Sequence, residues 1–339
     1  MKTHYLSTDE YGLNTAAELL KQGGLVGIPT ETVYGLAADA QNGAAVAEIF
    51  RAKGRPQDNP LIVHIASMEQ LPALVRDIPP IALQLAEAYW PGPLTMIFPK
   101  SDVVPSEVSA GLDTVAVRMP AHPVAAELIR RSGCPLAAPS ANRSGSPSPT
   151  TAQRVMEDMN GRIAAVVDGG ACAVGVESTV IDLTVEPPRL LRPGGVTPRM
   201  LEEVVGEIVV DEAVISPLKE GEKAASPGMK YKHYAPRAKV ILLKGSQEAY
   251  VAYVNAHATQ GVGALCLAED AELLTVPCVV YGSRNDAASQ AAGLFDALRR
   301  LDEQGIEVAY GVCPEDDGLS LAVYNRLLRA AGFEVMTLE

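Results

Sequence analysis

The chain has 339 residues, of which 47% are hydrophobic and 20% charged, and its formal net charge at pH 7 is −13. This length predicts two domains, because it exceeds what one ordinary hydrophobic core contains. The hydrophobic content excludes a largely disordered chain. The negative charge argues against broad, non-specific nucleic-acid binding, although it leaves room for a local basic cavity.

The cysteines and the N-terminal segment exclude further classes of protein. Five cysteines are scattered along the chain without a CxxC pair, which argues against a disulfide framework or a zinc site and fits a reducing compartment. The N-terminal residues lack the apolar segment of a signal peptide, and no run of eighteen apolar residues occurs. We therefore expect a cytoplasmic protein that has no protein-ligated metal and no membrane association.

The first predicted elements are a short helix and a strand. The helix is expected over residues 16–22, with Asn14 or Thr15 as its cap, and the strand over residues 25–29. The strand ends in a polar turn that contains Thr30, Glu31, Thr32 and Tyr34. This segment is either an ordinary polar turn before a helix of small residues or a source of hydrogen bonds for a small polar ligand.

A second helix, over residues 43–53, brings Lys53 to a segment with the sequence KGRPQDNPLIVH. Its glycine and prolines prevent a long helix, so we expect a stiff loop with Arg55 and Asn59, and then a strand that ends near His64. Cations on a stiff loop suit a phosphate or a carboxylate. A surface loop with solvated charges is the alternative.

Two further strands follow an amphipathic helix over residues 81–90. They are expected over residues 94–98 and 114–120. In the second of them, alternation places Thr114 and Arg118 on one face and valines on the other. An arginine in such an apolar strand needs an internal carboxylate or a ligand as its partner.

The loop PLAAPSANRSGSPSPT follows a helix over residues 122–133 and carries Ser140 and Ser148. Its small residues would let backbone N–H groups approach a phosphate. The Walker A and Rossmann patterns are both absent, so a flexible linker is the alternative. In the strands that follow, Ser178 and Arg192 also stand near strand ends, where a mixed α/β sheet places a ligand site. These strands are expected over residues 164–170, 176–183 and 190–195.

The pattern divides the chain into three parts. Residues 1–210 form a domain with a mixed sheet, residues 211–238 form a linker, and residues 239–339 alternate strand and helix like a small α/β domain with a parallel sheet. The linker ends in SPGMKYKHYAP, which includes Tyr234. Aromatic and basic residues in such a segment suit a nucleotide base and phosphates, although a lone tyrosine in a linker is more often incidental.

Taken together, these segments resemble the Sua5/YrdC family in its long, Sua5-type form. The resemblance implies a YrdC-like twisted mixed-sheet α/β domain with a large cavity, followed by a smaller Rossmann-like α/β domain. It covers roughly residues 15–237, and the C-terminal domain matches only by position and α/β pattern. The motifs that carry it are PTETVYGL, KGRPQDNPLIVH, WPGPLT, VAVRMP, APSANRSG, VESTVIDL, LRPGG and SPGMKYKHYAP.

The resemblance implies a nucleotidyltransferase that makes threonylcarbamoyl-AMP and pyrophosphate from L-threonine, bicarbonate and ATP, with Mg²⁺ accompanying ATP. The product supplies the N6-threonylcarbamoyladenosine of tRNA position 37, so a tRNA threonylcarbamoyl-transferase machinery would act downstream. Lys53 and Arg55 would carry catalysis, and the linker would act as a lid. The implied L-threonine contacts are Thr32, His64, Arg118, Ala138 and Ser178. The implied ATP contacts are Arg55, Asn59, Thr114, Ser140, Ser148, Arg192 and Tyr234.

Two other functions are weighed against this synthase. The first is an RNA-binding module that uses the cavity of the first domain, which the charge of −13 and the small polar residue set disfavour. The second is a carbamoyl-transfer relative that uses carbamoyl phosphate, which the absence of attached acylphosphatase-like or zinc-finger segments disfavours. We therefore expect an enzyme without stable nucleic-acid binding.

Overall fold

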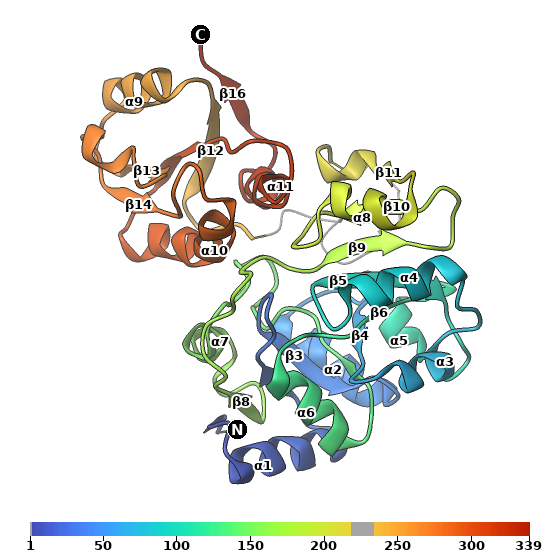
Figure 1. Ribbon diagram of the computed structural model, residues 1–339. Helices are drawn as coiled ribbons and strands as arrows, with labels where there is room; N and C mark the ends of the chain where they lie inside the picture. Colours follow the sequence, from blue (N-terminus) through green and yellow to red (C-terminus); the bar gives the residue numbers. More distant parts are fainter. Residues whose placement is uncertain (1, 218–233) are drawn as a thin grey trace.

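The computed structural model describes residues 2–217 and 234–339, which form two sheets with helices around them (Figure 1). Eleven strands in the first described range, 2–217, make one mixed sheet. In spatial order these are β1 (His4–Leu6), β8 (Ala165–Val167), β2 (Val26–Ile28), β3 (Gly35–Asp39), β7 (Leu136–Ala137), β4 (Ile62–His64), β6 (Thr114–Arg118), β5 (Leu94–Pro99), β9 (Thr179–Asp182), β10 (Arg189–Arg192) and β11 (Val209–Val210).

Helices cover both faces of this sheet, and the buried apolar residues form two main cores and one small cluster. One core contains the inner sides of α1 (Glu10–Lys21) and α6 (Pro123–Ser132), which pack against each other. The larger core lies among the remaining helices of the domain. These are α2 (Gly43–Lys53), α3 (Leu71–Leu74), α4 (Pro80–Tyr89), α5 (Ser106–Ser109), α7 (Ala152–Met159) and α8 (Pro198–Val205).

The second sheet is entirely parallel over the described residues, as the alternation of strand and helix predicts. Its spatial order is β14 (Cys278–Val280), β13 (Val262–Cys266), β15 (Val308–Val312), β12 (Lys239–Lys244) and β16 (Val335–Thr337). The helices that accompany it are α9 (Gln247–Ala256), α10 (Ala287–Glu303) and α11 (Ser320–Ala330). The predicted fold class, a mixed-sheet α/β domain and a smaller α/β domain with a parallel sheet, is therefore confirmed.

The predicted start of the first helix is wrong. The helix begins at Glu10, where the side chain of Asp9 accepts a hydrogen bond from the backbone N–H of Gly12 at 2.8 Å. Gly12 in its first turn serves a close approach, since a Cβ there would lie 2.1 Å from the carbonyl oxygen of Ser7. Thr151 and Thr197 cap α7 and α8 with their side chains.

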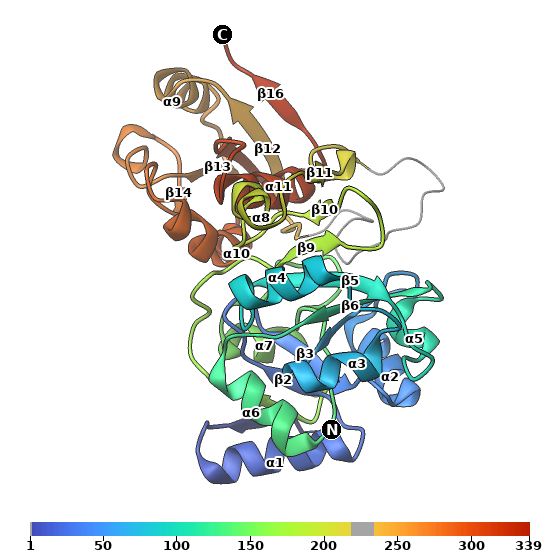
Figure 2. The same cartoon turned by 45° about the vertical axis from the view of Figure 1, so that its right-hand side comes forward.

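The two domains touch through α10 and α11 (Figures 1 and 2). On α10, Arg299 forms an ion pair of 2.7 Å with Asp158 of α7. The backbone of α10 also lies so close to Gly175 that a Cβ at this glycine would lie 2.3 Å from the Cα of Ala292. Because Gly175 has a φ of 81°, a larger residue there would be strained as well as crowded.

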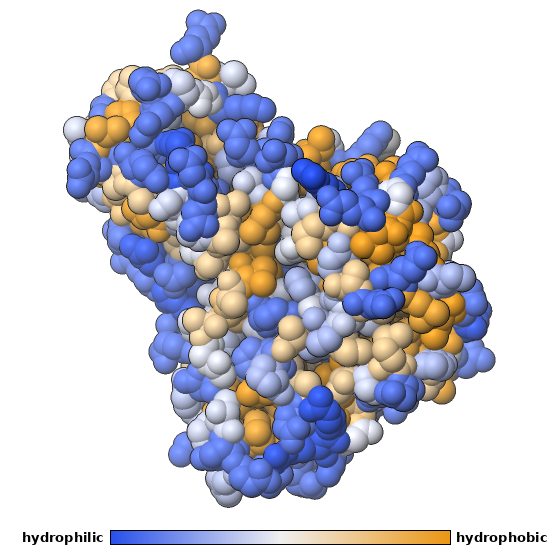
Figure 3. Space-filling model, in the orientation of Figure 1, coloured by the Kyte–Doolittle hydropathy of each residue, from blue (hydrophilic) through white to orange (hydrophobic). Residues whose placement is uncertain are grey.

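The surface and the domain boundary complete the description. Seen as in Figure 1, the surface is mainly hydrophilic over the second domain, and apolar side chains show near the junction of the two domains (Figure 3). No helix within the described ranges is long and apolar enough to span a lipid bilayer. Strand β11 ends at Val210 and β12 begins at Lys239, and much of the predicted linker, residues 218–233, lies outside the described residues. The lid prediction falls mainly on those residues.

Candidate active site

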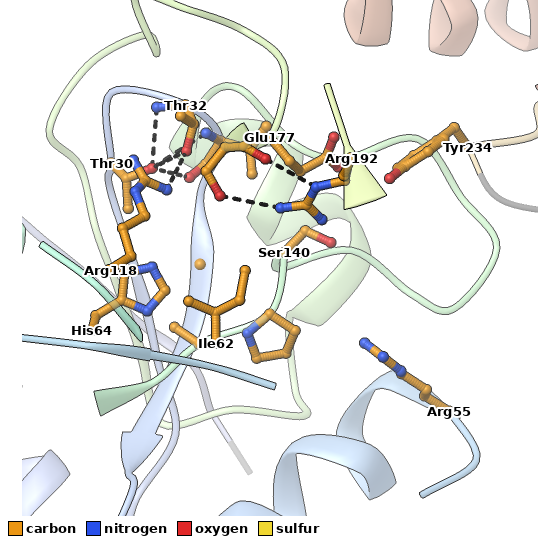
Figure 4. Close-up of a pocket in the computed structure, with 15 residues that line it drawn as sticks. Thr30, Thr32, Arg55, Ile62, His64, Arg118, Ser140, Glu177, Arg192 and Tyr234 are labelled. Atoms are coloured by element: carbon orange, nitrogen blue, oxygen red, sulfur yellow. Dashed lines mark hydrogen bonds between the residues drawn. The ribbon is translucent and has the colours of Figure 1, made fainter. Parts of the chain in front are cut away.

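A pocket in the first domain gathers side chains from segments far apart in the sequence (Figure 4). It contains about 590 Å³ of empty space, part of it open to solvent. Nine of the predicted site residues line it, so the convergence on which the sequence-based function depends is present. They are Thr32, Arg55, His64, Arg118, Ala138, Ser140, Ser178, Arg192 and Tyr234. The lining residues outside that prediction are Thr30, Val33, Gly35, Ile62, Pro139 and Glu177.

The register of the sheet explains why two of these side chains are neighbours. Strands β4 and β6 run parallel and pair His64 with Arg118. Both residues end their strands, and the turn after β2 brings Thr32 to the same place. In the view of Figure 4, Arg118 and His64 lie on one side of the pocket and Arg55 and Tyr234 on the other.

The partner of Arg118 is an internal carboxylate, one of the two alternatives that the sequence left open. Its Nη2 lies 2.5 Å from Oε1 of Glu31, its Nη1 donates to Oγ1 of Thr32 at 2.8 Å, and its Nε donates to the carbonyl oxygen of Gly92 at 3.1 Å. Burial would raise the pKa of Glu31, but the charge and hydrogen bond of Arg118 outweigh it and hold the pKa below its ordinary value. The pair is therefore ionised near neutral pH.

Glu31 was noticed in the sequence as part of a polar turn but was not selected as a site residue. Inside this turn the hydroxyl of Thr30 bonds to that of Thr32 at 2.8 Å and donates to the carbonyl oxygen of Val33 at 2.6 Å. The turn is thus fixed by its own hydrogen bonds while it supplies partners to Arg118. The sequence did contain a signal for Glu31. Arg118 stands in an apolar strand and needs a carboxylate partner, and Glu31 is a carboxylate in a turn at a strand end.

His64 is a neutral imidazole in this environment. Burial, reinforced by the charge of Arg118, lowers its pKa from 6.5 to about 3. Its Nδ1 is buried and forms no hydrogen bond with any described residue. A neutral ring nitrogen next to Arg118 is suited to exchange a hydrogen bond with an uncharged or weakly polar ligand group.

This lowered pKa predicts an acid-dependent loss of stability. Between pH 6.5 and about 3 the unfolded state binds a proton at His64 that the folded state does not, so stability falls as the pH falls through that window. We expect the free energy of unfolding of His64→Gln to fall less than that of the wild type, by about 1.4 kcal/mol, between pH 7.5 and 5.5.

Urea unfolding at the two pH values measures this difference. The exposed His257 of the second domain provides the control, since His257→Gln removes a surface histidine and leaves the buried site intact. Equal pH dependence of His64→Gln and the wild type would contradict a neutral buried imidazole.

Lys53 does not line the pocket. Its Nζ is buried and donates to the carbonyl oxygens of Ser140 and Asn142, the latter at 2.6 Å. Burial, followed by the nearby charge of Arg55, lowers the pKa of Lys53 well below its ordinary value. The amide of Asn142 in turn donates to the carbonyl oxygen of Ser146 at 2.8 Å. The serine-rich loop is therefore anchored, which is not the behaviour of a flexible linker.

Three predicted ATP contacts, Asn59, Thr114 and Ser148, stand outside the lining. Asn59 is buried, and its carbonyl oxygen accepts a hydrogen bond from Nη2 of Arg55 at 3.3 Å. Thr114 begins β6, at the opposite end of that strand from Arg118. Any role of Thr114 in ATP binding remains a prediction, whereas Asn59 lies directly behind a residue that does face the pocket.

Glu177 is the second carboxylate that the sequence-based analysis missed. Its Oε1 accepts a hydrogen bond from the hydroxyl of Ser148 at 2.5 Å. Ser148 therefore contacts a residue that lines the pocket, although it does not line the pocket itself. Burial would raise the pKa of Glu177, but Arg326 and Arg192 outweigh it and lower the pKa. The sequence feature that could have identified Glu177 is its place directly before Ser178, as a carboxylate within an apolar run.

Arg192 and Tyr234 complete the side of the pocket that faces the second domain. Nε and Nη2 of Arg192 donate to the carbonyl and the hydroxyl oxygen of Ser178, at 2.9 and 3.1 Å. Burial lowers the pKa of Arg192 to about 10, which still leaves it a cation at neutral pH. Tyr234 is buried against α10, with its ring centroid 5.0 Å from that of Phe295. The predicted nucleotide contact of the linker thus lies in the pocket and against the second domain.

Comparison with known proteins covers both domains. The family described as "Telomere recombination" matches residues 18–194, and the family described as "Threonylcarbamoyl-AMP synthase, C-terminal domain" matches residues 196–332. A protein of Pyrococcus abyssi named Threonylcarbamoyl-AMP synthase is 48% identical over 337 residues, which are 97% of this chain and 96% of that protein. A protein of Bacillus subtilis with the same name is 47% identical over 338 residues, 98% and 97% of the two chains.

A solved structure matches over the whole length. The crystal structure of P. abyssi Sua5 complexed with L-threonine has a TM-score of 0.92 and 45% identity to this chain, and each chain is covered completely. Similarity of this extent in both domains establishes common ancestry as well as a common fold. The chain therefore belongs to the Sua5/YrdC family, in its long form with a Sua5-type C-terminal domain.

Proposed function

We propose that this chain is an L-threonylcarbamoyladenylate synthase, a nucleotidyltransferase that converts L-threonine, bicarbonate or CO₂, and ATP into threonylcarbamoyl-AMP and pyrophosphate. Relatives with this name align along the whole chain, and a similar protein has been solved with L-threonine. The observation that carries the proposal is a single pocket with a paired arginine and a neutral histidine on one side and further arginines on the other.

The side of Arg118 and His64 suits an amino acid. A guanidinium has five N–H groups, and the three hydrogen bonds given above leave two of them for the threonine carboxylate. The neutral ring of His64 and the hydroxyls of Thr32 and Ser178 face the same space and would bind the amine and the hydroxyl of threonine. Ala138 would contribute its main chain, since its side chain has no polar atom.

The opposite side suits a triphosphate. Arg55 and Arg192 would share the negative charge that moves onto pyrophosphate as it leaves. The hydroxyl of Ser140, which donates to Oδ1 of Asn142 in the structure, would turn to donate to a phosphate oxygen. Ser148 would support this side through Glu177, and Asn59 through Arg55. We assign Lys53 the positioning of the serine-rich loop, because its ammonium already binds two carbonyl oxygens of that loop.

The reaction needs no nucleophile from the protein. The uncharged threonine amine attacks the carbon of CO₂ with loss of a proton, or that of bicarbonate with loss of water. An oxygen of the resulting carbamate then attacks the α-phosphorus of ATP while pyrophosphate departs. Catalysis then consists of placing the two substrates, stabilising charge and keeping out water, since a carbamate decomposes readily when hydrated. A partly enclosed pocket provides such an environment.

Mg²⁺ would enter with ATP. The ion would neutralise phosphate charge as the α-phosphorus is attacked. Within residues 2–217 and 234–339, no group of three or more His, Cys, Asp or Glu side chains is placed to hold a metal ion. The residues fit an ion held mainly by phosphate oxygens and water, which is the usual binding mode of Mg²⁺ with nucleotides.

The product would be passed to a tRNA threonylcarbamoyl-transferase machinery that modifies the adenosine at position 37, and a cytoplasmic location belongs to the same proposal. The competing RNA-binding function would use the same pocket. It is less well supported, because one cationic side of a small pocket does not provide the extended basic footprint that RNA binding needs.

The deciding experiment measures the products formed by the purified full-length protein. We expect AMP-linked threonylcarbamoyl product and pyrophosphate to form only when ATP, L-threonine and bicarbonate are all present. Pyrophosphate release that does not depend on threonine would overturn the proposal. Tight, steeply salt-dependent retention of duplex RNA on filters, without turnover of ATP, would favour the RNA-binding module.

A further inference from the structure

Arg326 of α11 is a buried arginine of the second domain whose hydrogen bonds reach into the first. It is fully buried, and its Nε donates to Oε2 of Glu177 at 3.0 Å. Its Nη1 donates to the carbonyl oxygen of Pro193 at 2.6 Å and to Oδ1 of the adjacent Asn325 at 3.0 Å. Its Nη2 donates to the carbonyl oxygen of Glu177 at 3.2 Å. Three of these four bonds therefore cross the domain interface.

The three interdomain acceptors belong to two segments that form one side of the pocket. Glu177 lines the pocket and holds the hydroxyl of Ser148. Pro193 directly follows Arg192, whose guanidinium also lines the pocket. Arg326 thus fixes both the carboxylate that orients Ser148 and the backbone that carries Arg192. Ser148 and Arg192 both belong to the proposed ATP side.

The amino-acid side is held differently. Arg118, Glu31 and Thr32 bond to one another and to the carbonyl oxygen of Gly92, all within the first domain. None of the four hydrogen bonds of Arg326 given above involves these residues. Of the proposed threonine contacts, only Ser178 is close to these bonds, since it directly follows Glu177. An effect of Arg326 on substrate binding should therefore be much larger on the ATP side of the pocket.

We infer that Arg326 is a positioning residue for the nucleotide, so that the second domain supplies a structural part of the ATP site. The inference rests on the proposed function for the identity of the ligand. A planar guanidinium suits this place because its five N–H groups can hold the carboxylate, the two carbonyl oxygens and the Asn325 amide at once, whereas a lysine has only three N–H groups on one nitrogen. The buried carboxylate of Glu177 would also lose its main compensating charge without Arg326.

The test compares two substitutions of interdomain arginines by lysine in the full-length protein. Arg326→Lys keeps the positive charge but loses the planar guanidinium that holds several acceptors at once. Arg154→Lys is the matched control. Arg154 of α7 also pairs across the interface, with Asp296 of α10 at 2.8 Å, but none of its carboxylate partners, Asp296, Glu157 and Glu303, lines the pocket, whereas Glu177, the partner of Arg326, does. KM is measured separately for ATP and L-threonine, and the affinity for a fluorescent ATP analogue is measured without turnover.

We expect Arg326→Lys to raise KM for ATP and the Kd of the analogue roughly tenfold, a size consistent with a small displacement of binding groups. KM for threonine should stay within about twofold, and Arg154→Lys should resemble the wild type in all three measurements. An equal rise for both substrates, no rise for ATP, or the same rise in Arg154→Lys would overturn the inference.

Two further measurements cover the cases in which Arg326→Lys does not fold or the proposed function is wrong. If thermal unfolding shows that Arg326→Lys does not fold, Glu177→Gln/Arg326→Gln carries the same expectation against Glu177→Gln alone, since the double variant leaves no unpaired buried charge at the interface. A wild-type protein that binds the analogue but makes no threonylcarbamoyl-AMP would refute the proposed function. The analogue affinities of the variants would still decide the role of Arg326.

Discussion

Replacement of Arg118 by glutamine is expected to raise KM for L-threonine about 100-fold, because a charge-assisted bond to a carboxylate contributes up to about 3 kcal/mol. The KM for ATP should change far less, since Arg118 and Arg55 lie on different sides of the pocket. Steady-state kinetics with each substrate varied in turn, on the purified variant, gives the comparison.

The same substitution also affects folding, and this effect must be separated from binding. Without Arg118 the buried carboxylate of Glu31 loses its ion-pair partner, which costs roughly 3–5 kcal/mol for a pair removed from water. We expect Glu31→Gln/Arg118→Gln to regain most of the stability lost by Arg118→Gln in urea unfolding, yet to keep the raised KM for threonine. Recovery of normal threonine binding in the double variant would contradict the assignment of Arg118 as the carboxylate ligand.

The second large effect is expected at Arg55. Its guanidinium lines the pocket on the loop after α2, so Arg55→Ala should lower kcat on the order of 100-fold through loss of charge stabilisation as pyrophosphate leaves. The side chain is only partly buried, so the folded structure should persist. Rapid-quench measurement of product formation at saturating substrates tests this expectation.

Arg51 provides the control for Arg55. It lies on the same helix, its side chain is 75% exposed, and it pairs with Glu48 on the helix surface. Arg51→Ala should therefore keep the wild-type kcat, since a surface pair of this kind contributes little. Similar losses in both variants would indicate a general electrostatic effect and would contradict a specific role of Arg55.

The parts of the site that could be predicted from the sequence share a physical reason. Strands of β-branched residues have a recognisable pattern, and polar residues at their ends are forced toward one edge of a sheet. His64, Arg118, Ser178 and Arg192 were found in this way. His64, Arg118 and Arg192 end their strands and Ser178 directly precedes β9, so local sequence was sufficient to place them next to a strand end.

The missed residues depend on contacts that no local pattern encodes. Glu31 is explained by an arginine 87 positions away, and Glu177 by one 149 positions away. Lys53 was predicted at the right place, but its ammonium turns toward the backbone of the serine-rich loop, a direction that only the packed structure determines. The predicted start of α1 was wrong because Asn14 and Thr15 are also good capping residues, and only the structure shows that the side chain of Asp9 is the cap.

The ion pair of Arg118 and Glu31 has a consequence for how the pocket sorts its substrates. Together with an uncharged His64, it leaves the amino-acid side with a formal charge of zero. A zwitterion is also neutral overall, so it can enter there without any electrostatic mismatch, whereas a polyanion gains more from the two arginines opposite. Selection by net charge would thus precede any recognition of shape.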